Sequence, residues 1–239
     1  MRLDLYLSEK YGYSRTKAAN MISDGFVSVN GKTAEKASFN VKDSDEVSVE
    51  REYRFASRGG DKLEKAFIDF RLDVKDKVCV DIGASNGGFT DCLLSHGAAK
   101  VYAVDVADCA FDDELRNDRR VVIVDNFNAR ELSVSSLGEE CDFACIDVSF
   151  ISLKLVLPAV YSVVCIGGEI VALIKPQFEA GRKNLSKTGL VLSEKVRKTV
   201  VDDICAFAAA LGAEVDGITT APKREGKNVE YLVRLKKRL

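Results

Sequence analysis

Short apolar runs alternate with longer amphipathic stretches from residue 58 to residue 239. Apolar runs of this length are typical of strands buried on both faces of a sheet, and the stretches between them have helical spacing. The alternation predicts a doubly wound, Rossmann-like α/β sheet. Five runs predict its parallel strands, namely 77–82, 100–105, 121–125, 142–147 and 169–174.

Two further runs near the end, 215–219 and 229–235, bring the predicted mixed sheet to seven strands. Helical spacing predicts one helix that opens near Lys62, before the first strand, and others between the strands. Those helices are expected near 89–96, 112–117, 129–137, 153–165 and 193–211.

Residues 1–50 have a different pattern, which predicts two short helices and a small sheet. Ser14 is a good N-cap for the second helix. The pair Asn30-Gly31 is a strong signal for a tight hairpin turn, and residues 46–50 alternate as a strand. So small an α+β unit leaves little room for a catalytic site, and we therefore predict a binding module.

Residues 51–57 mix charged and aromatic side chains without periodicity, which indicates a linker. Tyr53 and Phe55 are expected either to pack between the flanking parts or to stack on a base, and packing is favoured. The predicted organisation is a module at 1–50, a linker at 51–57 and an α/β domain at 58–239.

The 239 residues are 46% apolar and 30% charged, an ordinary globular balance. The net charge is −2, so a nucleic-acid partner must be met by a local basic patch. Seven scattered cysteines without a C-x-x-C pair, and a single histidine, argue against a metal site or a disulfide framework. No apolar stretch can cross a bilayer, and the first residues do not resemble a signal peptide. We therefore expect a cytoplasmic protein with no metal and no membrane partner.

The first strand of the predicted sheet ends in a glycine-rich turn, D-I-G-A-S-N-G-G-F-T, at residues 81–90. Doubly wound folds bind cofactors at this turn. Dinucleotide enzymes have G-x-G-x-x-G there, whereas this chain has G-x-x-x-G-G after an acidic residue. A carboxylate suits a cationic ligand better than a diphosphate, and the turn resembles that of S-adenosylmethionine-dependent methyltransferases. The implied contacts to S-adenosylmethionine are Asp81, Gly83, Ala84, Ser85, Gly87, Gly88 and Phe89.

In such methyltransferases, acidic residues at later strand ends complete the pocket. Asp105 would bind the ribose hydroxyls of the cofactor, and Asp125 would bind its adenine amino group. Asp147, at the end of the fourth strand, is expected to lie beside the methyl donor. Each carboxylate alone could be a helix cap or a loop charge, but carboxylates at successive strand ends favour a cofactor site.

Asp147 and Lys175 end adjacent parallel strands, so both are expected at the carboxyl rim of the sheet, where ligands bind. A methyltransferase sheet usually inserts its last strand antiparallel beside the fifth, which would bring Glu230 to the same rim. Lys62 opens the helix before the first strand. Four residues far apart in sequence are therefore predicted to converge beside the methyl donor.

Five segments together resemble the TlyA family of ribosomal RNA 2′-O-methyltransferases, which have an FtsJ-like catalytic domain and are often labelled hemolysin A. The resemblance covers the whole chain and implies a catalytic tetrad of Lys62, Asp147, Lys175 and Glu230. Two runs that flank the expected adenosine pocket, 107–111 and 125–127, depart from the family's usual sequence. The five matching segments are 57–63, 83–90, 147–153, 175–179 and 228–230.

A ribose 2′-hydroxyl is a poor nucleophile at neutral pH, whereas a sulfonium methyl group is already activated. The work is therefore positioning and proton removal. A lysine can be a base only where desolvation or a second cation favours its neutral form. We expect Lys175 to accept the proton, with Lys62 as the second cation and with Asp147 and Glu230 orienting the amines. The alternative for these four residues is a surface salt-bridge cluster.

The first fifty residues contain R-L-D-x-x-L, then S-R-x-x-A-x-x-x-I-x-x-G-x-V-x-V-N-G, then D-x-V-x-V. These motifs resemble the RNA-binding fold of ribosomal small-subunit protein S-four, in which the second helix and the hairpin face RNA. Cations there would meet phosphates and read little sequence. The implied RNA-binding residues are Arg2, Arg15, Lys17, Lys32 and Lys36.

Two basic loops of the α/β domain, 181–189 and 223–227, are expected on the catalytic rim and could clamp RNA phosphates. In the first loop the candidate RNA-binding residues are Arg182, Lys183 and Lys187. For all the predicted RNA contacts the alternative is solvated surface charge.

The leading interpretation is therefore S-adenosylmethionine-dependent 2′-O-methylation of ribosomal RNA, with the ribosomal subunit as partner. The resemblance implies a cytidine. Because the chain ends soon after its last strand, as in the shorter family form, large-subunit RNA is expected. The alternatives are a membrane-active hemolysin, a non-catalytic RNA-binding or ribosome assembly factor, and a small-molecule methyltransferase. The absence of an export signal or a cationic amphipathic helix disfavours the first, and the N-terminal module disfavours the last.

Overall fold

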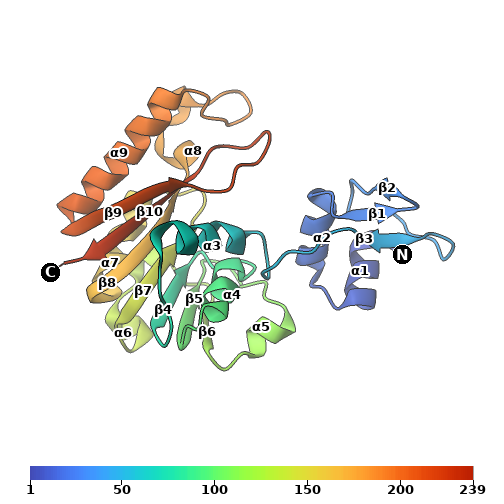
Figure 1. Ribbon diagram of the computed structural model, residues 1–239, viewed down its shortest axis with the longest axis horizontal. Helices are drawn as coiled ribbons and strands as arrows, with labels where there is room; N and C mark the ends of the chain where they lie inside the picture. The colour runs from blue at the N-terminus through green and yellow to red at the C-terminus, as the bar shows by residue number, and fades with distance from the viewer. Residues whose placement is uncertain (239) are drawn as a thin grey trace.

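A computed structural model describes residues 1–238. Within them, a small N-terminal part is joined by an extended segment to a larger α/β part (Figure 1). The sheet of the larger part has the strand order β6-β5-β4-β7-β8-β10-β9. Its strands are β4 (Val78–Ile82), β5 (Lys100–Val104), β6 (Val121–Val124), β7 (Cys141–Ile146), β8 (Val164–Ile174), β9 (Ala213–Thr220) and β10 (Tyr231–Lys237).

The pairing of these strands confirms the predicted seven-stranded mixed sheet. Strands β4 to β8 pair in parallel, whereas β10 is antiparallel to both β8 and β9. Tyr231, the first residue of β10, lies opposite Ile174, the last residue of β8. The beginning of β10 is therefore at the rim where the parallel strands end, as the sequence predicted.

Helices cover both faces of the sheet and complete a three-layer fold (Figure 1). One apolar core lies between the sheet and α3 (Gly59–Phe70), α4 (Gly88–Ser95) and α5 (Asp113–Asn117). The other lies between the sheet and α6 (Val134–Leu137), α7 (Leu153–Val163) and α9 (Glu194–Ala210). The short α8 (Pro176–Glu179) and the 3₁₀ turn η2 (Arg182–Asn184) follow β8.

Two predicted elements of the larger part were wrong in detail. The helix expected at 129–137 is divided into a 3₁₀ turn, η1 (Ala129–Glu131), and α6, because Ser133 begins a new helix through a capping box with Ser136. The helix expected at 153–165 ends at Val163, and β8 begins at once at Val164, where a start at 169 was expected. Val164 pairs with Cys141 of β7, so sheet pairing overrides an apolar run that reads equally well as helix.

The N-terminal part has the predicted architecture. Its elements are α1 (Leu3–Tyr11), α2 (Arg15–Ser23), β1 (Val27–Val29), β2 (Lys32–Thr33) and β3 (Val47–Val49). The Ser14 side chain caps α2 by accepting the Lys17 N–H. Asn30 and Gly31 have φ values of 51° and 72°, as a two-residue hairpin turn with both residues left-handed requires. Side chains from α1, α2, β1 and β3 share one apolar core.

The segment between the two parts is fixed by its aromatic residues. Tyr53 is 8% exposed and belongs to the N-terminal core, while Phe55 is 3% exposed and belongs to the core under α3. The Phe55 ring also fills the space beside Gly60, where an added Cβ would lie 2.4 Å from it. Packing, rather than stacking on a base, is therefore what occupies these rings, as predicted.

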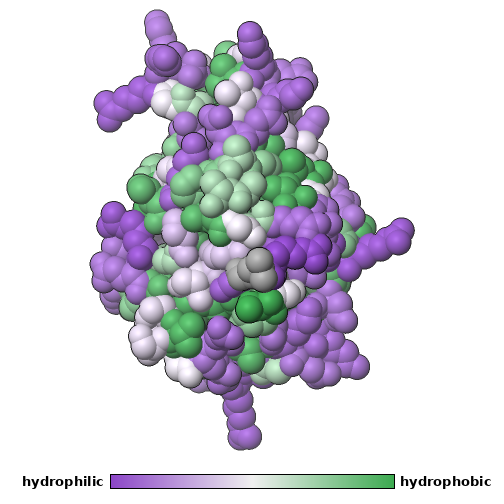
Figure 2. All heavy atoms as spheres, turned by 90° about the vertical axis from the view of Figure 1, so that its left-hand side faces the viewer, coloured by the Kyte–Doolittle hydropathy of each residue, from purple (hydrophilic) through white to green (hydrophobic). Residues whose placement is uncertain are grey.

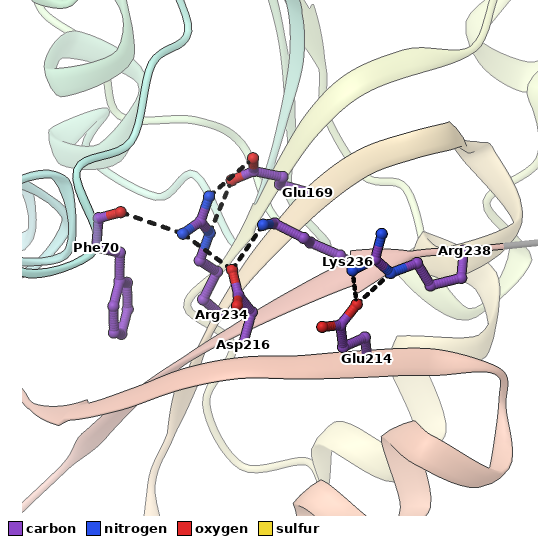
Figure 3. A network of polar contacts seen from close by, with 7 residues as sticks. All are labelled: Phe70, Glu169, Glu214, Asp216, Arg234, Lys236 and Arg238. Carbon is purple, nitrogen blue, oxygen red and sulfur yellow. Dashed lines mark hydrogen bonds and ion pairs between the residues drawn. The ribbon is translucent and has the colours of Figure 1, made fainter.

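A network of charged side chains holds the edge of the sheet together (Figure 3). Arg234 of β10 donates to both carboxylate oxygens of Glu169 on β8, each at 3.0 Å, and pairs with Asp216 on β9 at 3.0 Å. It also donates to the Phe70 carbonyl at 3.2 Å, while Lys236 pairs with Asp216 at 2.8 Å. One guanidinium thus ties β10 to both neighbours and to α3, which fixes the strand that follows Glu230.

Within residues 1–238, no helix combines the length and the apolar character that crossing a bilayer requires. Figure 2 shows the side of the molecule at the left of Figure 1, where hydrophilic side chains surround small apolar areas.

Candidate active site

The four predicted catalytic residues lie together at the carboxyl rim of the sheet. Lys62 comes from the first turn of α3, Asp147 and Lys175 directly follow β7 and β8, and Glu230 directly precedes β10. Lys175 Nζ lies 2.5 Å from Asp147 Oδ1. Lys62 Nζ lies 3.5 Å from Asp147 Oδ2 and 2.8 Å from Glu230 Oε2. The two carboxylates thus alternate with the two amines, and side-chain exposure at the four positions is 22% or less.

Two further polar residues contact the tetrad, and sequence reasoning did not select either of them. Lys175 Nζ donates to Ser149 Oγ at 2.7 Å. Gln177 Nε2 donates to Glu230 Oε1 at 3.5 Å. Both stand two residues after a tetrad member in the sequence, and this spacing was the available signal. Lys175 therefore has two oxygen partners, which fix the position of its amine.

Two adjoining cavities meet at the tetrad. The larger, of about 420 Å³, extends along the ends of β4 and β5 past Asp105. The smaller, of about 230 Å³, contains Lys62 and Lys175 and reaches Asn20 of the N-terminal part. Both volumes suit small ligands or parts of larger ones. Four residues line both cavities and so mark the place where two ligands would touch, namely Gly83, Ser85, Asp147 and Ser149.

The glycine loop is shaped by close contacts within the protein. Gly83 has φ +85°, and an added Cβ would lie 2.6 Å from the Asp147 carbonyl oxygen. A Cβ on Gly87 would lie 2.2 Å from Leu115, and one on Gly88 would lie 2.3 Å from Ser57 Oγ. These glycines therefore let the loop pack on its neighbours. Gly83 also lines both cavities, whereas Gly87 lines neither. Of the other predicted loop residues, the smaller cavity is lined by Ala84, Ser85, Gly88 and Phe89.

Asp81 does not face either cavity, so the expected direct contact to a cofactor is not what the fold offers. Its side chain is completely buried and accepts a hydrogen bond from Thr90 Oγ1 at 2.7 Å. Burial raises the pKa of Asp81 to about 7. The carboxyl group thus joins the end of β4 to the first turn of α4 and shapes the loop from below.

Asp105 lines the larger cavity and also holds the glycine loop. Its Oδ2 accepts the Ser85 N–H at 2.9 Å and its Oδ1 accepts the Ala107 N–H at 3.0 Å. A carboxylate has about four acceptor positions, so two remain for hydroxyl groups. Asp125 does not line this cavity; its Oδ1 accepts the Cys109 N–H at 2.7 Å and so fixes the divergent run 107–111.

The remaining wall of the larger cavity comes from residues that the sequence analysis did not select as contacts, although Phe127 belongs to the run 125–127 expected beside the adenosine pocket. They follow the ends of β5, β6 and β7 and are mostly apolar. Phe150 is 90% exposed, has φ +64° and lies with its ring 5.1 Å from that of Phe178. The unpredicted wall residues include Val106, Phe127, Asn128, Phe150 and Ile151.

The predicted RNA-binding cations of the N-terminal part are all at its surface, but they differ in their partners. Arg2 and Arg15 both pair with the buried Asp4, at 2.9 and 3.1 Å. The hydrogen bond from Arg2 lowers the pKa of Asp4 to about 2. Lys17 lies over the Tyr13 ring, 5.1 Å from its centroid. Lys32 and Lys36 are exposed and form no ion pair within the described chain.

The two basic loops of the larger part lie side by side. Asn228 accepts the Val191 N–H at 2.8 Å and donates to the Gly189 carbonyl at 3.0 Å, which joins the connection after η2 to the one before β10. Both project from the rim end of the sheet (Figure 1). The exposed cations Arg182, Lys183 and Lys187 have no acidic partner among residues 1–238. Their charge is therefore free to meet an external anion.

One cluster of potential metal ligands occurs in the described residues, made of Glu64, Cys92 and His96. His96 Nε2 lies 2.6 Å from Glu64, and the imidazole stacks on Phe67 with ring centroids 3.8 Å apart. Arg54 pairs with the same carboxylate at 2.6 Å. Burial raises the pKa of the Cys92 thiol. These contacts account for the three side chains as a structural cluster between α3 and α4.

The family profile of FtsJ-like methyltransferases matches residues 55–237, and the S4 domain profile matches residues 1–47. Hemolysin A of Brachyspira hyodysenteriae is 41% identical over 97% of this chain and 98% of the relative. The 16S/23S rRNA (cytidine-2′-O)-methyltransferase TlyA of Mycobacterium tuberculosis is 38% identical, with coverage of 93% and 84%. The 23S rRNA (cytidine-2′-O)-methyltransferase TlyA of Campylobacter jejuni is 31% identical, with coverage of 97% for both.

A solved structure from Streptococcus thermophilus that carries the hemolysin name is 39% identical, covers 100% of this chain and 88% of that one, and superposes with a TM-score of 0.79. The sheet order, the rim and these matches define a Rossmann-like methyltransferase that carries an N-terminal S4 domain. The chain belongs to the TlyA family of FtsJ-like rRNA 2′-O-methyltransferases, the family in which the hemolysin A name also occurs.

Proposed function

We propose that this enzyme transfers the methyl group of S-adenosylmethionine to the ribose 2′-hydroxyl of a cytidine in ribosomal RNA. The single observation that carries the proposal is the position of the tetrad. Asp147 lines both cavities and touches both lysines, so a methyl donor in one cavity would meet a ribose in the other at this residue.

The residues of the larger cavity fit S-adenosylmethionine. Asp105 offers acceptor positions for ribose hydroxyls, while Phe127 and Ile151 offer apolar surface for an adenine ring. Gly83 lets the backbone approach where the cavities join. Two of the expected contacts would act indirectly. Asp81 would shape the glycine loop, and Asp125 would hold the run 107–111 in place. When bound, S-adenosylmethionine supplies a methyl group on a positively charged sulfur, which needs no further activation.

The chain's own residues then have to position the ribose and take one proton. Lys175 Nζ, in its neutral form, would accept the proton of the 2′-hydroxyl, while the cofactor would supply the methyl carbon for the new bond to the 2′-oxygen and would keep the electron pair of the carbon–sulfur bond. Ser149 and Asp147 hold that amine in place. Lys62 pairs with Asp147 and Glu230 and so places a second cation beside the carboxylate that holds Lys175.

Ribosomal RNA as the substrate is supported by two independent features of the chain. The S4 domain carries surface cations, and the two joined loops of the larger part carry more beside the rim. Cytidine is the nucleotide in the names of the M. tuberculosis and C. jejuni relatives, and 23S rRNA is the substrate common to both names. We therefore propose large-subunit rRNA as the substrate of this enzyme.

The test is methyl transfer from tritiated S-adenosylmethionine to separated ribosomal subunits that lack the modification. Label in the RNA of large subunits is expected, and no label in either subunit would overturn the proposal. The name of the B. hyodysenteriae relative gives the second candidate, membrane lysis. Leakage of dye from phospholipid vesicles by the pure protein distinguishes it, and no leakage is expected.

A further inference from the structure

A carboxylate of the N-terminal part, Asp24, binds two arginines of the larger part. Asp24 directly follows α2, and its side chain is 8% exposed. Arg58 Nη1 lies 2.9 Å from Asp24 Oδ1, and Arg224 Nη2 lies 2.5 Å from the same oxygen. Tyr53 donates its hydroxyl to Asp24 Oδ2 at 2.5 Å. Three donors therefore converge on one carboxylate, two from the connection between β3 and α3 and one from the connection between β9 and β10.

The two arginines belong to the segments that carry the tetrad. Arg58 directly precedes α3, one helical turn before Lys62, and lines the smaller cavity with it. Arg224 lies in the connection between β9 and β10, which ends at Glu230. Asn20 lines the same cavity from α2, the helix that Asp24 follows. The contact between the two parts thus borders the cavity that would receive the ribose.

Two guanidinium groups that converge on one anion form an arrangement typical of phosphate binding. The Arg58 and Arg224 side chains are 43% and 38% exposed, so an external anion can approach them. A ribose with a free 2′-hydroxyl carries a phosphodiester on the neighbouring 3′-oxygen. Any RNA that presents its hydroxyl to Lys175 therefore brings backbone phosphates to the border of this cavity.

We propose that Arg58 and Arg224 form a binding site for a backbone phosphate of the substrate RNA, and that Asp24 occupies this site until the RNA displaces it. The inference rests on the proposed function, since it assumes an RNA substrate. After displacement, Asp24 keeps the Tyr53 hydroxyl as a partner and is hydrated. The exchange replaces one charge-assisted contact with another, so it is reversible and depends on salt.

A masked site of this kind has a measurable consequence, because RNA competes with an internal carboxylate. Removing the charge of Asp24 frees both arginines and strengthens RNA binding. If Asp24 serves only to clamp the two parts together, the same change weakens RNA binding or leaves it as it was. The direction of the effect therefore decides between the two roles.

The experiment measures binding of the full chain to a fluorescein-labelled single-stranded RNA oligonucleotide by anisotropy, over a series of KCl concentrations. The variants are Asp24→Asn, Arg58→Gln, Arg224→Gln and each arginine change combined with Asp24→Asn. Asp118→Asn is the matched control, since Asp118 also pairs with an arginine, Arg120, but lies outside both cavities. Asp24→Ser repeats the test with a smaller side chain, and circular dichroism checks that each variant is folded.

Asp24→Asn is expected to bind the oligonucleotide about fivefold more tightly, the usual effect of one partly exposed charge pair. The slope of its affinity against salt concentration, both on logarithmic scales, should steepen by about 0.7 for each additional phosphate that the protein neutralises. When combined with Asp24→Asn, Arg58→Gln and Arg224→Gln should each cancel most of the increase in affinity. Asp118→Asn should bind the oligonucleotide like the unchanged protein. Binding by Asp24→Asn that equals or falls below that of the unchanged protein would overturn the inference.

The binding assay does not require methyl transfer. A failure of the proposed phosphate site can therefore be distinguished from a failure of the proposed function. A chain that binds the oligonucleotide in the predicted order but labels no ribosomal RNA contradicts the proposed function and supports the phosphate site. A chain that labels ribosomal RNA while Asp24→Asn loses affinity contradicts the phosphate site alone.

Discussion

The amine of Lys175 lies 2.5 Å from Asp147 Oδ1, across two parallel strands that end side by side. Asp147 Oδ2 in turn lies 3.5 Å from Lys62 Nζ. The Asp147 carboxylate therefore lies between two amines at the junction of the two cavities. Its position depends on the ends of β7 and β8 and on the start of α3, so the fold itself assembles the reacting groups.

Asp105→Ala is expected to weaken S-adenosylmethionine binding by roughly 1–3 kcal/mol, because it removes the acceptor of two loop amides as well as a partner for ribose hydroxyls. Isothermal titration calorimetry measures this directly. Asp108→Ala is the control in the same loop, since Asp108 pairs with Asn126 at 2.8 Å and lies outside both cavities. Equal affinities for the unchanged protein and Asp105→Ala would contradict the cofactor assignment.

A double change of Lys32→Gln and Lys36→Gln is expected to weaken RNA binding about threefold to tenfold, since each exposed cation neutralises a phosphate and releases counterions. S-adenosylmethionine affinity should not change. The pair Lys195→Gln and Lys198→Gln on α9 provides a control with the same charge difference. If both doubles reduced RNA affinity equally, the assignment of the S4 domain as an RNA contact would fail.

Phe150→Ala is expected to lower kcat/KM for RNA methylation, because this exposed ring directly follows Ser149, which lines both cavities, and so offers a surface on which an RNA base can stack. Stacking of a base on an aromatic ring contributes about 1–3 kcal/mol. Phe150→Tyr keeps the ring and should retain activity. Steady-state kinetics with ribosomal RNA measure the effect, and an Ala variant as active as the Tyr variant would count against stacking.

Asp81 makes the stability of the fold depend on pH. Its pKa of about 7 in the folded state lies above the unfolded value of about 3.9. Between these two pH values the folded state therefore keeps a proton on Asp81 that the unfolded state has lost. The free energy of unfolding contributed by this group is therefore highest at low pH and falls as the pH rises toward 7. Asp81→Asn cannot titrate and should remove this dependence, which amounts to on the order of 4 kcal/mol at most.

Urea denaturation of both proteins at pH 5 and pH 8 tests that expectation. The stability of Asp81→Asn relative to the unchanged protein should rise between the two pH values. Parallel behaviour of the two proteins would mean that Asp81 is ionised in the fold throughout this range.

The strand ends were predictable because each buried strand is an apolar run that stops at a polar residue. This is why Asp105, Asp147 and Lys175 could be placed at one rim from the sequence. The start of β8 was not predictable, since the apolar residues around Val164 suit a helix or a strand and only pairing with β7 decides. The role of Asp81 was also hidden, because a sequence does not show which way a side chain at a strand end points.

Contacts between separate segments were the least predictable part. The pairing of Asp24 with Arg58 and Arg224 depends on how the two parts of the chain meet, and no local pattern encodes it. Ser149 was missed for a similar reason, since a serine in a loop has no distinguishing signal until Lys175 is found 2.7 Å away.

Nucleoside mass spectrometry of ribosomal RNA after incubation with enzyme and S-adenosylmethionine tests the central claim most directly. The unchanged protein should produce 2′-O-methylcytidine in large-subunit RNA. Lys175→Ala and Lys175→Arg should produce none while still binding cofactor and RNA, because arginine keeps the charge but does not accept a proton. Near-normal turnover by Lys175→Arg would contradict the assignment of Lys175 as the base, and absence of 2′-O-methylcytidine with the unchanged protein would contradict the account as a whole.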